Sequence, residues 1–144
     1  MTKRVILLAA LLAACGKEVG RIPMTGEGEG DASVSLKADQ PLALWTTLDV
    51  MWDGTWTPAY DVELRDSSGK AVATTKCDPL STSTRVSSVI TNMGNHHTRS
   101  YAGKMQCDLK APSAGAYTVH TRLTYGGSKP TSLTVKDISL VLKI

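Results

Sequence analysis

The sequence predicts an all-β protein built as a single antiparallel β-sandwich. From Ala32 onward apolar residues recur at every second position, which is the period of a strand with one buried face. No window has the 3.6-residue period of a long helix. Clusters of Gly, Pro, Asp and Ser divide the chain into roughly eight short strands, a spacing typical of a sandwich. We therefore place one domain over residues 32–144.

The longest alternating run lies over residues 42–52. Its even-numbered side chains form an apolar face that ends at Trp52, so we expect Trp52 in the core and Trp45 on the opposite face. Tyr60, Val62 and Leu64 alternate in the same way, and the Asp66–Gly69 turn then returns the chain toward Cys77 as a hairpin. Further strands are expected over residues 34–36, 86–90, 101–110, 117–125 and 133–144, with loops at 92–99 and 111–115.

The start of the chain has a different character. Lys3 and Arg4 precede an unbroken run of apolar and small residues, 5–14, and Cys15 follows at once. The run has about ten residues, which suits a signal-peptide core and is too short to span a bilayer. The order Leu12-Ala13-Ala14-Cys15 resembles the lipobox of bacterial lipoproteins. This resemblance implies removal of residues 1–14 and conversion of Cys15 to a diacylglyceryl-modified, N-acylated (palmitate-type) first residue.

A lipidated Cys15 implies attachment to a membrane, because two or more acyl chains give stable anchoring. In lipoprotein families that are sorted between membranes, Gly16 in place of an aspartate implies the bacterial outer membrane. Residues 15–31 hold a Gly-Glu repeat and no apolar period, so we expect a lipidated N-terminus and flexible linker there. An ordinary secretory signal, cut near Cys15, is the alternative.

Charge and cysteine content narrow the class of protein. Loss of Lys3 and Arg4 leaves 16 − 2 = 14 basic residues against 13 acidic ones, a balance that argues against a nucleic-acid partner. Cys77 and Cys107 remain as an even pair in an oxidising compartment, so we expect one disulfide. In the chain-entropy account such a loop closure stabilises the fold by about 3.5 kcal/mol.

One segment suggests a particular kind of sandwich. Residues 112–119 resemble the entry to the F strand of immunoglobulin-like and fibronectin-type domains, where a tyrosine, here Tyr117, bonds to the backbone a few residues upstream. The hairpin of residues 60–72 looks like the C–C′ pair of that architecture. The pattern departs at Val119, which stands where an immunoglobulin domain has a cysteine. A jelly roll of the carbohydrate-binding kind is the competing topology.

Four residues are candidates for a binding surface. Trp45 faces away from the core strand face, and Trp56 lies in a polar loop, where an exposed indole suits stacking on a sugar or anchoring a protein. Burial of both indoles, with Trp56 capping one end of the core, is the alternative. His96 and His97 lie in the expected loop at 92–99, near methionines. Their spacing matches no copper site, and a solvated loop explains them better.

No pattern in the sequence indicates catalysis, a metal or a cofactor. A nucleophile elbow, a His-Glu-x-x-His pair and a phosphate-binding glycine loop are all missing from the sequence. We expect a non-enzymatic, lipid-anchored envelope protein that binds an envelope protein or a glycan in an adhesion, motility or secretion assembly. A carbohydrate-binding module and an enzyme-inhibiting lipoprotein are the alternatives.

Overall fold

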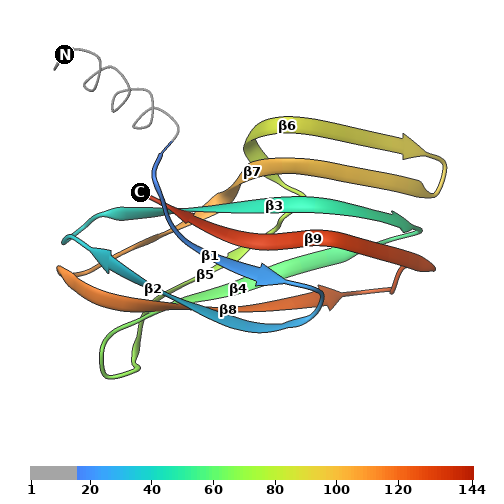
Figure 1. The fold of residues 1–144 in the computed structure, drawn as a ribbon. Coiled ribbons are helices and arrows are strands. Elements are labelled where there is room, and N and C mark those ends of the chain that lie inside the picture. Colours follow the sequence, from blue (N-terminus) through green and yellow to red (C-terminus); the bar gives the residue numbers. More distant parts are fainter. Residues whose placement is uncertain (1–15) are drawn as a thin grey trace, which may run out of the picture.

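The computed structural model describes residues 16–144, so the predicted signal peptide and lipidation at Cys15 lie outside the described residues. The described part is built from nine strands and contains no helix (Figure 1). Within it, no helical segment has the length and apolar character needed to cross a membrane. The strands are β1 (Glu18–Met24), β2 (Gly28–Leu36), β3 (Pro41–Asp53), β4 (Thr57–Arg65), β5 (Ala71–Cys77), β6 (Thr82–Met93), β7 (His96–Lys110), β8 (Gly115–Gly126) and β9 (Ser132–Lys143).

The strands form two antiparallel sheets packed face to face, which confirms the expected sandwich. The five-stranded sheet has the order β1-β9-β3-β7-β6, and the four-stranded sheet has the order β2-β8-β4-β5. Apart from β6, the strands pair first with last, β1 with β9, and then inward, β2 with β8, β3 with β7 and β4 with β5. This nested pairing is the topology of a jelly roll.

The strand order therefore matches the competing topology and not the immunoglobulin-like one. In an immunoglobulin domain the first two strands are neighbours in one sheet, whereas β1 and β2 here belong to different sheets. The tyrosine corner is nevertheless present, because the Tyr117 hydroxyl donates to the Ser113 carbonyl at 2.5 Å. A tyrosine corner is a local device, so it does not determine how the strands are ordered.

The core lies between the sheets and is lined by the alternate side chains that the sequence predicts. Leu44, Leu48 and Trp52 of β3 face Tyr60 and Leu64 of β4, and all are buried. The Tyr60 hydroxyl lies 3.3 Å from the Thr46 hydroxyl, so one buried hydrogen bond joins the two sheets. Burial raises the pKa of Tyr60 and keeps it neutral.

The predicted disulfide between Cys77 and Cys107 is confirmed. Its Cα atoms are 5.6 Å apart, and it joins β5, at the edge of one sheet, to β7 in the other. The expected hairpin is confirmed as well, since β4 and β5 pair across the Asp66–Gly69 turn. Gly69 has a φ of 85° there, which favours glycine.

The expectation of a flexible linker over residues 15–31 is wrong for most of its length. Residues 18–24 form β1 and residues 28–31 begin β2, and both strands pair with strands from the far end of the chain. Ile22 and Met24 are buried in the core. A Cβ on Gly30 would collide with Cγ2 of Ile22, so the glycine marks a close approach of the two sheets and not a flexible segment.

The expected loop at 92–99 is wrong too. β6 and β7 form a hairpin whose turn is Gly94–Asn95, so His96 and His97 belong to a strand. Gly94 has a φ of 60°, and this allows a tight connection. Figure 1 shows the hairpin tip at the opposite end of the sandwich from Gly16, where the chain enters β1.

The packing of β1 predicts the effect of a substitution. Truncating Ile22 to alanine removes a buried side chain from the core and should lower the free energy of unfolding by about 2–4 kcal/mol. Urea unfolding of the disulfide-bonded protein measures the change. Arg21→Ala is the matched control, because Arg21 lies on the exposed face of the same strand and should cost less than about 1 kcal/mol. A stability unchanged by Ile22→Ala would mean that residues 18–24 are a linker.

Candidate functional site

The end of the sandwich farthest from Gly16, called here the distal end, is held together by Asp53. Its carboxylate accepts hydrogen bonds from the His96 imidazole at 2.8 Å and from the Ser132 hydroxyl at 2.6 Å. Its main-chain carbonyl accepts from the Thr131 amide at 2.9 Å. Asp53 therefore ties the end of β3 to the β6–β7 hairpin and to the β8–β9 connection. The hydrogen bonds from the Ser132 hydroxyl and the His96 ring lower the pKa of the Asp53 carboxyl.

Beside Asp53, an aromatic cluster closes the core at the distal end. The Trp52 ring lies 5.1 Å from that of Trp56, and Trp56 meets Tyr125 edge-on at 5.5 Å. The His97 ring stacks on Trp52 at 5.0 Å. Trp52 is buried in the core, as predicted.

Trp56 is not the exposed indole that the sequence suggested. Only 4% of its surface is accessible, so the alternative holds, in which Trp56 caps one end of the core. Its Nε1 has no hydrogen-bond partner among the described residues. A flat, open face for sugar stacking is not available at this position.

Trp45 lies on the outer face of the five-stranded sheet, as its position in the alternation predicts. It is nevertheless 91% buried, since 9% of its surface is accessible. The Lys143 ammonium lies 4.0 Å from the centre of its ring, a cation–π contact that covers the indole. Trp45 therefore lies beneath the Lys143 side chain and does not project from the sheet as an exposed anchor.

His96 and His97 do not form one site. Successive residues of a strand face opposite sides of a sheet, and here His96 contacts Asp53 while His97 contacts Trp52 and Asn92. Over residues 16–144 no group of three His, Cys, Asp or Glu side chains is placed to hold a metal ion.

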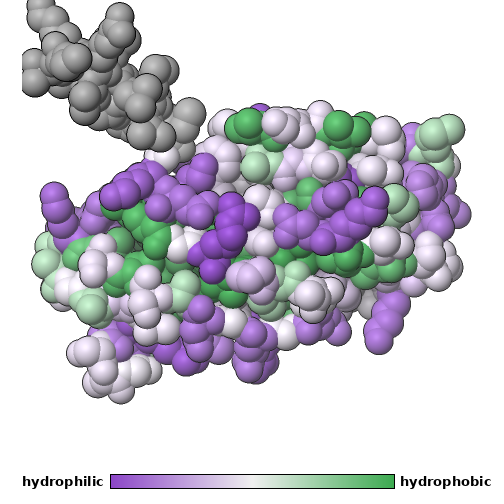
Figure 2. All heavy atoms as spheres, in the orientation of Figure 1, coloured by the Kyte–Doolittle hydropathy of each residue, from purple (hydrophilic) through white to green (hydrophobic). Residues whose placement is uncertain are grey.

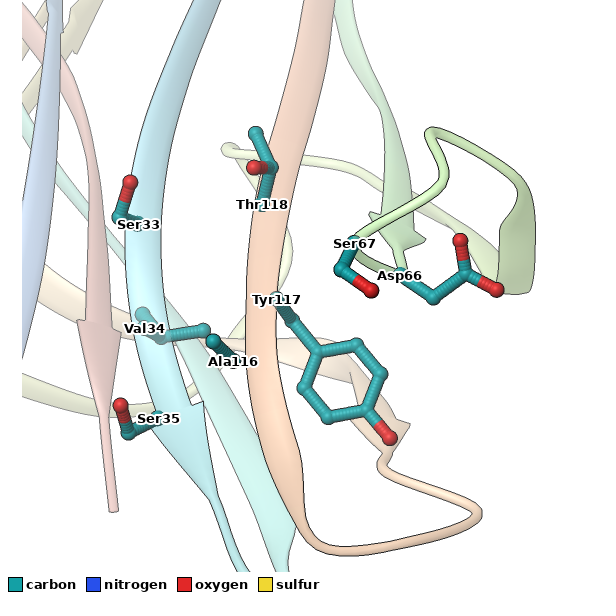
Figure 3. Close-up of a pocket in the computed structure, with 8 residues that line it drawn as sticks. All are labelled: Ser33, Val34, Ser35, Asp66, Ser67, Ala116, Tyr117 and Thr118. Carbon is teal, nitrogen blue, oxygen red and sulfur yellow. The ribbon is translucent and has the colours of Figure 1, made fainter.

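A hollow of about 260 Å³ opens between β2, β8 and the β4–β5 turn (Figure 3). Serine and alanine side chains line much of it, together with the Tyr117 ring. Its one charged group, Asp66, already accepts hydrogen bonds from the amides of Ser68 and Lys70 and from the Ser68 hydroxyl. Those bonds close the turn and lower the pKa of Asp66. The role of Asp66 in the turn therefore explains its presence without a bound ligand.

The outer face of the four-stranded sheet is charged and internally paired. His120 of β8 lies 2.6 Å from Asp31, and Arg122 lies 2.8 Å from Glu29, both on β2. The Arg122 guanidinium is the main reason that the pKa of Glu29 is lowered. These cross-strand pairs satisfy one another, as expected for a solvated sheet face.

The sequence predicts a strand over residues 86–90, but not that it extends over Thr82–Met93 as the exposed edge strand β6. It pairs only with β7, and its outer side chains Val86, Val89 and Met93 are 53%, 56% and 75% exposed. Figure 2 shows hydrophobic atoms along this edge of the molecule. A β-bulge at Ser87 and Ser88 puts Val86 and Val89 on the same face. The sequence carried a partial signal, because this stretch is β-prone and holds one charged residue, Arg85.

The chain matches no protein-family model and no curated protein. Two solved structures of infectious bursal disease virus resemble it weakly. The Gx strain structure has a TM-score of 0.37 and 13% identity over 90% of this chain and 31% of that chain. The Gt strain structure has a TM-score of 0.34 and 10% identity over 89% and 28%. This chain thus spans about a third of those chains, and scores at this level support no argument about function.

The Asp53 cluster makes a prediction about proton binding. Because hydrogen bonds favour the carboxylate, the pKa of Asp53 should lie below the ordinary value of about 3.9. The resulting stabilisation is present above the ordinary pKa and is lost as the pH falls through the lowered value. In Ser132→Ala the pKa should rise, since the Ser132 hydroxyl makes the largest contribution.

Carbon-13 NMR titration of the Asp53 carboxyl measures this pKa directly. Thr131→Val is the matched control, because the Thr131 hydroxyl reaches only the main-chain carbonyl of Asp53 and should leave the pKa in place. An identical midpoint in wild type and Ser132→Ala would show that the Ser132 bond does not hold the carboxylate.

Proposed function

We propose that this protein is a lipid-anchored component of the bacterial cell envelope, held on the outer membrane, with a non-catalytic binding or structural role. The proposal starts from the lipobox, Leu12–Cys15. The structure supports it because Gly16, the residue after Cys15 in the sequence, already lies against Lys143 and Ile144 of the sandwich. Lys17 already exchanges two backbone hydrogen bonds of 2.9 Å with Ile144, and β1 begins at Glu18. An acylated Cys15 would hold the sandwich directly at the membrane surface.

The exposed edge of β6 is the observation that carries the binding role. Natural proteins protect a sheet edge with charged residues, Pro, bulges or a covering segment. In β6 such devices are confined to its first half, which holds Arg85 and the bulge, and Val89–Met93 contains no charged residue and no Pro. The register with β7 shifts between Thr82 and Thr84 and again at Ser87 and Ser88, whereas Val89–Met93 pair regularly with β7. That stretch offers free backbone groups and two exposed apolar side chains.

An extended segment of an envelope protein fits this edge best. It would add as a further strand, gaining main-chain hydrogen bonds from β6 and apolar contacts from Val89 and Met93. The tip of the hairpin lies at the distal end, so a domain tethered at Gly16 presents it away from the anchor (Figure 1). Anchoring also raises the local concentration of the domain near other envelope proteins.

The two alternatives differ in their support. The carbohydrate-binding hypothesis relied on open faces of Trp45 and Trp56, and both indoles are buried. The inhibitor hypothesis required a rigid segment at 92–99, and the β6–β7 hairpin is such a segment. Inhibition of muramidases or proteases by the purified protein, lost in a variant with a shortened hairpin, would favour the inhibitor role over strand addition.

Two measurements test the proposal. The intact mass of the protein from bacterial membranes should show Cys15 as the first residue with acyl groups, and Cys15→Ser should move the protein to the soluble fraction.

Photo-crosslinking from position 91, between the two apolar residues Val89 and Met93, should yield adducts with an envelope protein in intact cells. Val89→Lys with Met93→Lys should reduce the adduct yield at least about fivefold, because apolar contact is lost and charge is added.

The matched control places the same two charges on β5, an edge strand of the four-stranded sheet. Ala71 and Thr74 of β5 are exposed, so Ala71→Lys with Thr74→Lys adds equal charge and should leave the adduct yield unchanged. An unmodified thiol at Cys15 would contradict the anchor. Equal yields from the β6 and β5 variants would contradict strand addition at β6.

A further inference from the structure

The outer face of the five-stranded sheet is hollowed beside Gly16, where the chain enters the fold. A depression of about 340 Å³ lies there, with the Trp45 ring in its floor. Lys104 and Lys143 line it from two strands, and Val86 and Ile144 add apolar surface. Val86 and Ile144 are 53% and 39% exposed, so the rim of the depression is both basic and apolar.

The strand register places these residues together. Trp45 is paired with Lys104 on one side and with Val141 on the other, and Lys143 pairs with Ala43 two residues along. Paired residues of adjacent strands share a face. The hollow is therefore part of the ordered sheet surface and does not depend on a loop.

Charge is distributed unevenly along this face. At the end near Gly16, Glu18 pairs with Arg21 at 2.8 Å and lies across from Lys143 in the register of β1 and β9. Lys104 and Lys143 have no ion-pair partner within 4 Å among the described residues, and Glu18 and Asp108 are the nearby acids. The next acids, Asp49 and Asp137, are directly paired across β3 and β9. Asp49 lies four residues beyond Trp45, about 13 Å along the strand.

From this arrangement we propose that the hollow docks on the membrane surface, with Lys104 and Lys143 against the phosphates of anionic lipids. The inference rests on the proposed anchor, because Gly16 lines the hollow and is the residue after Cys15. With no flexible linker, anchored acyl chains enter the bilayer within reach of these lysines. Val86 and Ile144 then contact the headgroup region, as apolar residues of peripheral proteins do.

Docking by the Gly16 end of this face fixes the orientation of the domain. The end that carries Lys104 and Lys143 meets the bilayer and the strands rise from it, so Asp49 and Asp137, about 13 Å farther along the strands, lie farther from the lipid. Val89, which is level with Asp49 through Ser100, and the rest of the β6–β7 hairpin then lie farther from the bilayer than Val86. Two lysines near an anionic surface favour this orientation about 30-fold over one that turns them to solvent.

Lysine footprinting on vesicles tests the proposal. Cys15 is the one thiol outside the disulfide, so the mature chain can be coupled there to a maleimide lipid whether or not cells acylate it. Vesicles of phosphatidylcholine are compared with vesicles that also contain phosphatidylglycerol, using a water-soluble acetylating reagent and mass spectrometry. Lys104 and Lys143 should react at least about threefold more slowly on the anionic vesicles.

Lys76 and Lys129 are the internal controls. Lys76 lies on β5 of the other sheet and Lys129 in the β8–β9 connection, and both are exposed, so their rates should not change. A second measurement uses the Cys15→Ser chain, whose weak sedimentation with anionic vesicles should fall at least about 30-fold in Lys104→Glu with Lys143→Glu. Lys76→Glu with Lys129→Glu carries the same charge change and should sediment like the parent chain.

Three results would overturn the docking surface. The first is equal reactivity of Lys104 and Lys143 on both kinds of vesicle. The second is the same protection from inorganic phosphate alone, which would indicate a small-anion site. The third is protection that grows with protein density at constant lipid, which would indicate contact between copies. None of these results bears on acylation in cells, which the intact mass of Cys15 measures separately.

Discussion

The pairing of β1 with β9 is the constraint on which the rest of the structure depends. It brings the segment after Cys15 into the five-stranded sheet and places Gly16 beside Ile144, at one end of the sandwich. Because these two ends of the chain meet there, any group attached at Cys15 is held close to a defined face. The nested pairing of the remaining strands then carries the β6–β7 hairpin tip to the opposite end (Figure 1).

This arrangement separates two kinds of surface on a small domain. Near Gly16 the outer face is basic, with Trp45 shielded by Lys143. At the distal end, hydrogen bonds from Asp53 brace the hairpin against the neighbouring connections. The Cys77–Cys107 bond joins the two sheets near the start of β6, so the edge strand projects from a cross-linked base. Because the base is rigid, less conformational entropy is lost when a partner binds to the edge strand.

Much of the fold could be predicted from the sequence because the core obeys a strict period of two. The burial of Trp52 and the 60–72 hairpin follow from this period. The disulfide is expected from the even pair of cysteines, and the Tyr117 corner from the resemblance of residues 112–119 to an F-strand entry. β1 and the start of β2 could not be predicted from local patterns. β1 pairs with residues more than a hundred positions away in the sequence, and the start of β2 pairs with residues at nearly that separation. Gly30 also lies in a Gly-rich stretch typical of a linker, although a glycine is needed there because Ile22 packs directly against its backbone.

The candidate site was harder to predict for a related reason. Burial of Trp56 depends on Trp52 and Tyr125 meeting it from two other strands, and no local pattern reports such a contact. The sequence places His96 and His97 in one loop because it does not show that the turn is as short as Gly94–Asn95. The choice between jelly roll and immunoglobulin-like order rests on which strands are neighbours, and short motifs such as the Tyr117 corner occur in either.

Hydrogen–deuterium exchange, followed at residues 17–24, tests the central claim most directly. If β1 is part of the sheet, the amides of this segment that bond to β9 should be protected well above the level of an unstructured peptide. Exchange at the rate of an unstructured peptide over residues 17–24, beside a protected β9, would show that this segment is a loose tether and not a strand of the sheet.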